Sequence, residues 1–502
     1  MNSKNANQSN AHQTTNSIIS FPYLGLNSAE HYFEAVASWP YSLLLHSGGS
    51  DKDQYDILLA APERVIVSSQ SNHQTTHRVY EFECDQVSIP MNRDAEFSKV
   101  KEVGDLFSTL NRWLKEKGSK LSANETEHKH FSSLSKDVFT GGLAGALSYD
   151  FGRQLENIPQ SAKNDIGLPD LCLGLYYCPV IIDHKRQTVS LYNFFQRPKT
   201  AERLAHWFMQ NNPTGTSDKS VFKITRPWFS NMAENDYAEK FAKVKHYIKA
   251  GDCYQINLAQ RFECEYQGNP WAVYKYLVEL NQAPFSGYFN LGPSQILSLS
   301  PERFISVADG HAITQPIKGT QPRGVNAEQD QAYKEALQNS EKDQAENLMI
   351  VDLLRNDLSR TAVPGSVKVS ELFGLYSFPS VHHLISTVES DIDPIYSNLD
   401  VLRAAFPGGS ITGAPKVRAM EIIEELEPHR RSFYCGSLVY FGFNGRMDSN
   451  IMIRTLIANQ EKLYTWAGGG LVDDSTCELE YQETFTKLSK ILDPLMQINE
   501  SI

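Results

Sequence analysis

The sequence predicts an α+β fold with a large proportion of antiparallel sheet, rather than a doubly wound parallel sheet. Two pairs of short segments with alternating apolar residues are separated by tight-turn sequences, which is the pattern of β-hairpins. They are 287–291 and 296–300 around Gly292-Pro293, and 304–307 and 312–314 around Asp309-Gly310. Other stretches have the apolar period of helices, and hairpins combined with long helices favour an α+β architecture.

A helix followed directly by a strand is predicted around residue 250. The apolar residues of the helix fall on one face, at Tyr237, Phe241, Val244 and Ile248. Gly251 is the expected end of the helix, because glycine is favoured just past a helix C-terminus. The strand is indicated by alternation of Tyr254, Ile256 and Leu258 with Gln255 and Asn257.

The second hairpin brings a carboxylate and an amine close together. The register of its two-residue turn places Glu302 opposite Ile317, one residue from Lys318. Strict alternation would direct Lys318 to the other face of the sheet, whereas Pro316 and Gly319 allow an irregularity there. Two explanations therefore fit the pattern: a catalytic acid with a nucleophilic or basic lysine, or an ordinary cross-strand salt bridge.

The composition is that of a globular protein and argues against a nucleic-acid partner. The 502 residues are 41% hydrophobic and 21% charged. Lys and Arg number 47 against 59 Asp and Glu, which gives a net charge of −12. An acidic chain repels a polyanion on average, although a local basic site for a small anion is compatible with this charge.

Cysteine usage and the N-terminus indicate a cytoplasmic protein. The seven cysteines have no CxxC or zinc-type spacing, which is typical of reduced thiols. No apolar run approaches the roughly 20 residues that a membrane-spanning helix needs, so no membrane association is expected. Residues 1–17 are almost all polar, which predicts a disordered leader rather than a signal peptide.

Two regions are expected after this leader. Residues 18–200 form the N-terminal region and residues 221–496 the region that carries the chemistry. Polar stretches at 117–136 and 196–220 are the candidate excursions from packed structure, and the second is the expected boundary.

Two predicted helices carry the carboxylates of a candidate Mg²⁺ site. One begins at the capping box 340–343 and contains Glu346. The other begins at 475–478, where the same capping pattern is expected, and carries Glu480 and Glu483 on one face. Like charges at this spacing repel unless a cation lies between them, and Mg²⁺ prefers carboxylate oxygens. A solvated acidic face explains the same pattern. The expected buried stripe of the second helix is Tyr481, Phe485, Leu488 and Leu492.

Two glycine-rich segments and one arginine suggest an anion site. Segments 407–416 and 467–470 offer backbone amides to an anion, although each also suits a tight turn. A helix is expected at 417–426. Arg454 lies in an apparent apolar strand at 451–454, and a buried guanidinium needs a partner. That partner is either a structural carboxylate or the carboxylate of a ligand.

The longest of these motifs resemble the chorismate-utilising enzymes. The resemblance covers about residues 22–490 and is densest at 251–258, 300–304, 345–357, 407–420 and 481–484. Lys318 resembles the lysine of the aminodeoxychorismate synthases, whereas anthranilate and isochorismate synthases carry alanine in the same Pro-Ile-x-Gly-Thr motif. The resemblance implies a four-layer α/β/β/α sandwich with two orthogonally packed, largely antiparallel sheets.

The resemblance also implies a reaction and its residues. Chorismate would be aminated at carbon 4 through a covalent adduct on Lys318, with Glu302 as the acid. Glu346 and Glu483 match the Mg²⁺ ligands of the family, with Glu480 close by. The matched substrate-binding positions are Arg454, Gly470, Tyr434, His383 and Ser410.

A tryptophan-type site is implied in the N-terminal half. Its matched positions are Ser47, Tyr55, Pro284, Phe285 and Ser286. His46 stands where anthranilate synthases usually carry Glu, so a tryptophan held as a structural ligand fits better than feedback inhibition. An ordinary buried strand also explains the apolar residues before His46.

No segment resembles the cysteine elbow of an amidotransferase. Ammonia is therefore expected from a separate glutamine amidotransferase subunit, in the synthesis of 4-aminobenzoate and folate. Two alternatives are the large subunit of an anthranilate synthase and a non-catalytic subunit that only binds an aromatic amino acid. The product formed from chorismate distinguishes the three.

Overall fold

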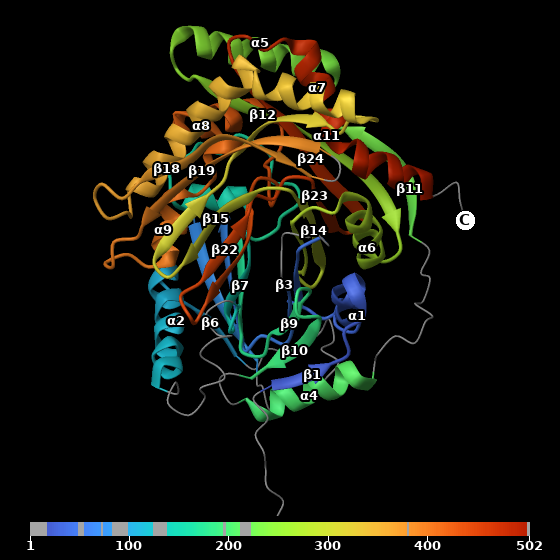
Figure 1. Ribbon diagram of the computed structural model, residues 1–502, viewed down its shortest axis with the longest axis vertical. Coiled ribbons are helices and arrows are strands. Elements are labelled where there is room, and N and C mark those ends of the chain that lie inside the picture. The colour runs from blue at the N-terminus through green and yellow to red at the C-terminus, as the bar shows by residue number, and fades with distance from the viewer. Residues whose placement is uncertain are drawn as a thin grey trace, which may run out of the picture.

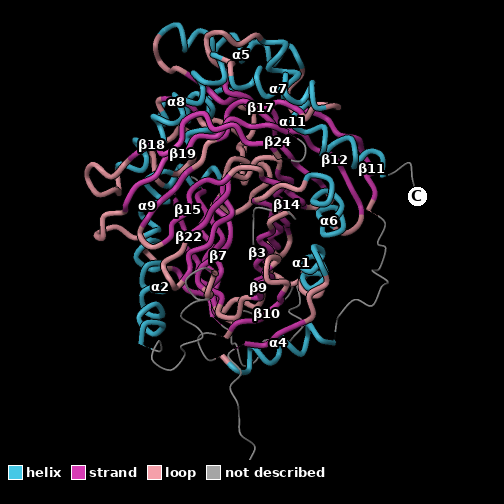
Figure 2. The backbone as a smooth tube through the Cα atoms, viewed as in Figure 1, coloured by secondary structure: helices cyan, strands magenta, loops and turns pink. Residues whose placement is uncertain are grey.

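The computed structural model describes residues 18–48, 55–71, 74–82, 99–123, 138–193, 197–210, 222–378 and 381–498. The predicted leader, 1–17, lies outside these residues. Two large sheets form the interior and the helices lie on the outside (Figures 1 and 2). Every ladder between the described strands is antiparallel, which confirms the predicted α+β class with two antiparallel sheets.

The first sheet, sheet A, has twelve strands. In spatial order they are β1 (Ile18–Phe21), β10 (Thr188–Tyr192), β9 (Val180–Asp183), β3 (Tyr55–Leu59), β2 (Leu43–His46), β13 (Phe285–Asn290), β14 (Ser294–Ser300), β23 (Thr455–Asn459), β24 (Lys462–Leu471), β12 (Gln255–Gln267) and β11 (Lys223–Ser230), with β20 (Gly413–Ala414) paired to β12.

The second sheet, sheet B, also has twelve strands. In order they are β17 (Ile317–Pro322), β19 (Val381–Asp391), β16 (His311–Thr314), β15 (Arg303–Ala308), β22 (Met447–Asn450), β21 (Ser437–Gly442), β7 (Gly142–Leu147), β8 (Leu171–Tyr176), β4 (Arg64–Ser71), β5 (Gln74–Glu81) and β6 (Lys99–Glu102), with β18 (Lys368–Ser377) paired to β19.

Helices cover the outer faces of both sheets. Sheet A carries α1 (Ser28–Glu34), α4 (Pro198–Gln210), α5 (Glu234–Ala250), α6 (Pro270–Asn281), α10 (Lys416–Leu426) and α11 (Cys477–Gln497). Sheet B carries α2 (Leu106–Ala123), α7 (Ala327–Gln338) and α8 (Glu341–Ser359), and α9 (Asn398–Ala405) packs against α8. Figure 1 shows α5, α7, α8 and α11 gathered at one end of the molecule, over β12, β24 and β19.

Both sheets contain strands from both halves of the chain. In sheet A, β2 pairs with β13, and in sheet B, β7 pairs with β21. The two regions expected from the sequence therefore share both sheets and one large buried core. Within the described ranges, no helix is both long and apolar enough to cross a membrane.

The predictions based on local pattern are mostly confirmed. The helix α5 buries Tyr237, Phe241 and Val244, and Gly251 ends it in the left-handed conformation with φ of 81°. The strand β12 follows as predicted, but Tyr254 lies outside it and is 70% exposed, because the ladder begins at Gln255.

The polar stretches were predicted less well. Stretch 117–136 begins inside α2, and 196–220 contains α4, because both stretches supply helix-forming residues to amphipathic helices. Positions 124–137 and 211–221 lie outside the described residues.

Both predicted hairpins are present. Residues of β13 pair with β14, and β15 pairs with β16 in the predicted register, with Ala308 opposite His311. The continuation of this register is wrong, however. The strand β17 does not lie beside β15 but pairs with β19, so Ile317 is opposite Ile385 rather than Glu302.

Candidate functional site

The candidate site lies where the chain passes between the two sheets. The chain leaves sheet A at Ser300 and enters sheet B at Arg303, and Glu302 lies between them. It returns from sheet B at Asn450 to sheet A at Thr455, and Arg454 lies in that second crossing. The predicted strand at 451–454 is therefore wrong: apolar periodicity does not distinguish a buried strand from a buried crossing.

Hydrogen bonds hold the two crossings together. The backbone amide of Ile451 donates to the carbonyl oxygen of Glu302 at 3.0 Å. The Ser300 hydroxyl donates to the carbonyl oxygen of Ile451 at 2.6 Å. Glu302 and the segment leading to Arg454 are consequently fixed relative to each other by backbone contacts.

Glu302 and Lys318 face the same site. The Ser410 hydroxyl donates to Glu302 Oε1 at 3.0 Å, and Lys318 Nζ lies 3.5 Å from the carbonyl oxygen of Ser410. The β17–β19 ladder shifts register between Ile317 and Thr320, and Gly319 has φ of 81°. This irregularity breaks strict alternation and decides the orientation that the sequence left open.

The environment of Glu302 keeps part of its carboxyl groups protonated near neutrality. Glu302 is 5% exposed, and burial raises the pKa of its carboxyl group to about 7. The charge of Lys318, the Ser410 hydroxyl, the amide of Ile317 and the charge of Lys487 all act in the opposite direction. A carboxyl group with a pKa near the working pH is suited to proton donation.

The guanidinium of Arg454 has no carboxylate partner among the described residues. Its backbone adopts φ of 50°, and burial lowers the pKa of its guanidinium with no carboxylate acting against it. Burial, with a further contribution from the charge of Arg454, lowers the pKa of His383 to about 4, so His383 is neutral at pH 7. Thr320 Oγ1 lies 2.8 Å from His383 Nδ1. An unpaired guanidinium beside a neutral imidazole suits an anionic ligand.

Two of the three predicted glutamates, Glu346 and Glu480, lie beside the glycine-rich end of β24. A Cβ atom on Gly470 would lie 1.8 Å from Gln255 Nε2 and 3.2 Å from Glu346 Oε1. A Cβ atom on Gly469 would lie 2.7 Å from Glu480 Oε2. A side chain at either position would displace the ends of the Gln255 and Glu480 side chains, and the bare backbone brings carboxylates of α8 and α11 to the same strand end.

The cap prediction at the start of α11 is wrong. Thr476 is the N-cap residue and makes no side-chain cap bond, whereas the Ser475 hydroxyl donates to Glu480 Oε1 at 2.7 Å. The Ser475 hydroxyl therefore orients the carboxylate of Glu480 and does not cap the helix. At the start of α8, by contrast, Ser340 accepts from the amide of Asp343 as predicted.

Two polar residues beside the candidate site were missed from the sequence. Lys487 forms an ion pair with Glu483 at 2.6 Å and donates to the carbonyl oxygen of Gly468 at 3.0 Å. Its spacing of four residues from Glu483 was the available signal. Gln255 is 1% exposed and its Nε2 lies 3.5 Å from Glu346 Oε1. The available signal for Gln255 was a polar side chain in a strand that is otherwise buried.

The remaining predicted substrate residue is packed inside the core. Tyr434 is 3% exposed, and its ring stacks on Trp466 with the ring planes 5° apart.

In the loop 407–416, the ammonium of Lys416 contacts Asp357 Oδ2 at 2.7 Å, and both side chains are buried. This lysine is therefore used structurally, at the start of α10.

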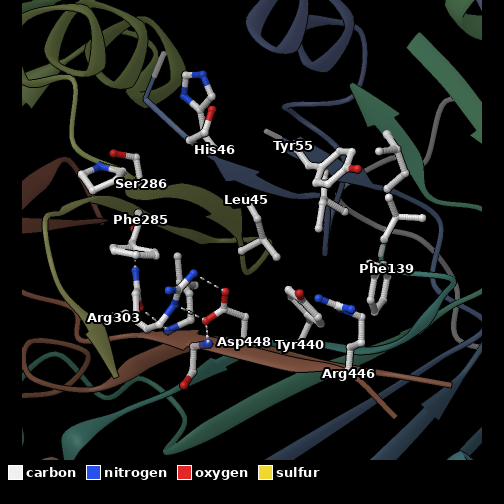
Figure 3. A pocket seen from close by; sticks show the side chains of 18 residues that line it. Leu45, His46, Tyr55, Phe139, Phe285, Ser286, Arg303, Tyr440, Arg446 and Asp448 are labelled. Carbon is white, nitrogen blue, oxygen red and sulfur yellow. Dashed lines mark hydrogen bonds and ion pairs between the residues drawn. The ribbon is translucent and has the colours of Figure 1, made fainter. Parts of the chain in front are cut away.

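A separate cavity of about 260 Å³ lies between the two sheets. Figure 3 shows its lining, with Leu45 and Tyr55 from sheet A facing Tyr440 and Asp448 from sheet B. The residues matched to a tryptophan-type site all line it: His46, Ser47, Tyr55, Pro284, Phe285 and Ser286.

Charged groups form one wall of this cavity. Arg303 makes two contacts of 3.1 Å with Asp448 and lies over the ring of Phe285. On the opposite side, His46 lies 3.6 Å from Glu30. Arg303 follows Glu302 directly in the chain, so the cavity and the candidate site are adjacent at the start of β15.

Comparison with known proteins identifies the family. The model of the chorismate binding enzymes matches residues 62–493. The chain belongs to the chorismate binding enzyme family.

Relatives within this family are similar over nearly their whole length. Aminodeoxychorismate synthase component 1 of Salmonella typhimurium is 44% identical, over 95% of this chain and 98% of the relative. The Escherichia coli protein of the same name is 43% identical, over 93% and 96%. Among solved structures, anthranilate synthase component I of Streptococcus pneumoniae has a TM-score of 0.71 at 28% identity, covering 88% of this chain and 92% of that one.

The unpaired state of Arg454 predicts a separation of stability from binding. Arg454→Met should leave the free energy of unfolding unchanged or raise it by up to about 1 kcal/mol, because it removes a desolvated charge without a partner. Binding of a carboxylate ligand should be lost. Urea denaturation and calorimetric titration with chorismate measure the two effects.

Arg261→Met is the matched control. Arg261 is 3% exposed and forms ion pairs with Asp165 and Glu263. Its loss should cost about 1–3 kcal/mol of stability, because the buried carboxylate of Glu263 loses its buried partner and keeps only Lys462. A comparable loss in Arg454→Met would show that Arg454 has a structural partner.

Proposed function

We propose that this chain aminates chorismate at carbon 4 with ammonia to give 4-amino-4-deoxychorismate. The observation that carries the proposal is the pair of Lys318 and Glu302, which converge on Ser410 in one site. The relatives named aminodeoxychorismate synthase component 1, at 43–44% identity over nearly full length, support the same activity.

The proposed reaction has two displacements. Lys318 Nζ, as the neutral amine, attacks ring carbon 2, both conjugated double bonds of the ring shift, and the bond between carbon 4 and its hydroxyl breaks while Glu302 donates the proton that lets it leave as water. Ammonia then adds at carbon 4, both double bonds shift back, and the bond to Lys318 breaks to release the amine. Covalent catalysis replaces one difficult displacement with two easier ones.

Glu302 is suited to the first displacement. A carboxyl group with a pKa of about 7 is protonated in a large fraction of molecules at neutral pH and can donate that proton. The Ser410 hydroxyl fixes its orientation.

Arg454 and His383 are proposed to hold the substrate. Chorismate carries two carboxylates, and the unpaired guanidinium of Arg454 is suited to bidentate contact with one of them. Neutral His383 contributes a hydrogen bond without an additional charge. The bare backbone at Gly470 lets the strand end approach the side chains of Gln255 and Glu346 closely.

Mg²⁺ is the proposed cofactor, held by Glu346 and Glu483 with Glu480 close by. Within the described residues, no group of three His, Cys, Asp or Glu side chains is arranged to hold a metal by itself. This fits Mg²⁺, which proteins bind through one or two carboxylates while water and substrate oxygens complete the coordination. When bound, the ion would screen the repulsion between the glutamates and a substrate carboxylate.

A glutamine amidotransferase subunit is the proposed source of ammonia. The designation component 1 of the relatives supports a second subunit. We place the reaction in the synthesis of 4-aminobenzoate and folate, where a lyase would remove pyruvate from the product.

Anthranilate synthesis is the second candidate, because a solved anthranilate synthase has the same fold. Purified protein incubated with chorismate, Mg²⁺ and ammonium decides between the two. Our proposal expects consumption of chorismate without fluorescent anthranilate. Formation of anthranilate in the absence of a lyase would overturn it.

The lysine adduct gives the most direct prediction. Wild-type protein incubated with chorismate in the absence of ammonia should gain the mass of chorismate minus water, and Lys318→Ala should not. Lys318→Ala should also lower amination by more than about 100-fold, because the nucleophile is removed. Intact-protein mass spectrometry and product analysis measure these effects.

Lys368→Ala serves as the control for the adduct, since Lys368 is 65% exposed on β18. It should keep both the adduct and the rate. A Lys318→Ala variant with the wild-type rate would exclude the covalent route.

The metal site predicts a change in Mg²⁺ dependence. Glu346→Gln should raise the Mg²⁺ concentration for half-maximal activity by about 10-fold or more, because one anionic ligand is lost. Asp352→Asn changes an exposed carboxylate on the same helix and should leave the titration unchanged. Equal titrations for wild type and Glu346→Gln would rule out Glu346 as a ligand.

Tryptophan is the proposed occupant of the 260 Å³ cavity, as a structural ligand. Support comes from a lining that combines aromatic rings with charged groups, which suits an aromatic amino acid. L-Tryptophan should raise the melting temperature of the wild type, since a ligand at 100 times its Kd adds about 2.7 kcal/mol of stability.

Leu45→Phe tests the position of this ligand. Leu45 points into the cavity (Figure 3), so a larger side chain should abolish the melting shift. Leu44→Met, a buried neighbour outside the cavity lining, should retain it. A saturable fall in amination rate with tryptophan would instead indicate a regulatory ligand.

A further inference from the structure

A buried ion pair lies just beyond the end of α10 and is not used by the proposed reaction. Arg431 and Glu427 are 1% and 3% exposed. Arg431 Nε donates to Glu427 Oε2 at 2.9 Å, and Nη2 donates to Glu427 Oε1 at 2.6 Å. Buried ion pairs are often no more stabilising than well-packed apolar side chains, so their other contacts are the informative part.

These other contacts end on the Ser410 turn and on the strand β12 of the candidate site. Arg431 Nη1 donates to the carbonyl oxygen of Ile411 at 2.8 Å, and Nη2 donates to the carbonyl oxygen of Asn257 at 2.6 Å. Ile411 follows Ser410, which contacts both Glu302 and Lys318.

The contact with Asn257 connects Arg431 to the part of the site where Mg²⁺ is proposed to bind. Asn257 lies opposite Gly470 in the β12–β24 ladder. Glu427 Oε1 also accepts from the backbone amide of Ala259 at 2.9 Å, two residues further along β12. The ion pair therefore holds the strand that carries the backbone next to Gly470.

The guanidinium also contacts a predicted substrate residue. It lies over the ring of Tyr434, with 5.7 Å from the guanidinium carbon to the ring centre, and over the ring of Tyr149 at 4.8 Å. The backbone amide of Tyr434 donates to the carbonyl oxygen of Arg431 at 3.0 Å. One side chain thus joins the Ser410 turn, the β12 strand and the Tyr434 turn.

We propose that Arg431 is a positioning residue of the amination reaction: together with Glu427 it fixes the Ser410 turn, and through that turn the placement of Glu302 and Lys318. The inference rests on the proposed function. Arginine suits this role because its planar group has five donors in a fixed fork, whereas lysine has three donors on one atom and cannot span the same set of acceptors.

A second buried ion pair, with its glutamate one turn earlier on α10, supplies the control. Glu424 is 3% exposed, lies on α10 and pairs with the buried guanidinium of Arg153. The contacts of Glu424 end elsewhere, since its Oε1 accepts from the backbone amides of Ser161 and Ala162. Glu424→Gln therefore removes the same kind of buried charge without touching the Ser410 turn.

The experiment is a double-mutant cycle on kcat and on the KM for chorismate, with Mg²⁺ and ammonium present. Ser410→Ala and Arg431→Lys should each lower kcat by about 10-fold, because each loosens the contact with Glu302. The kcat of the double variant should lie no more than about twofold below that of the less active single variant, because both changes act through one contact. The KM should stay within about threefold, since Arg454 is untouched.

Glu427→Gln is the second variant, in case Arg431→Lys does not fold, and it should show the same loss of kcat. Glu424→Gln should keep the wild-type kcat even where its melting temperature falls. Multiplicative effects of Ser410→Ala and Arg431→Lys, near 100-fold together, would overturn the inference. So would an equal loss of kcat in Glu424→Gln, which would indicate general destabilisation.

The wild type separates this inference from the proposed function. A wild-type protein that forms no aminated product overturns both. A wild-type protein that aminates chorismate while the two substitutions act independently overturns only the role of Arg431.

Discussion

The arrangement of this molecule depends on two points at which the chain changes sheets. Glu302 lies in one crossing and Arg454 in the other, and backbone hydrogen bonds through Ile451 join the crossings. A crossing between sheets is irregular, so its side chains are not bound to alternate between two faces. Both sheets and the helices around them hold these two short segments in place.

Local sequence features predicted most of the secondary structure near the site. The Asp309-Gly310 turn and the helix that ends at Gly251 depend on neighbouring residues, and both are found where predicted. The neighbour of β17 depends on the long β19 strand more than sixty residues later, and no local pattern contains that information. The same limit explains the predicted strand at 451–454, because apolar periodicity reports burial and not sheet membership.

The residues of the candidate site were found largely through resemblance, and their geometry came from the structure. The orientation of Lys318 depends on a register shift next to Gly319, which strict alternation would have excluded. Lys487 was not found, because an i, i+4 charge pair on a helix is common and usually lies at the surface, as this one does in part. Arg431 was not found, because its burial and its contacts with Ile411 and Asn257 cannot be read from its spacing to Glu427.

Strand sharing between the two halves has a consequence for how this chain can be divided. The edge of β2 is covered by β13, and the edge of β7 by β21. Either half expressed alone would expose a long unpaired strand edge on each sheet, and such edges promote association. The two halves should therefore be stable only together, as a complementing pair of fragments. Neither half is expected to fold stably by itself.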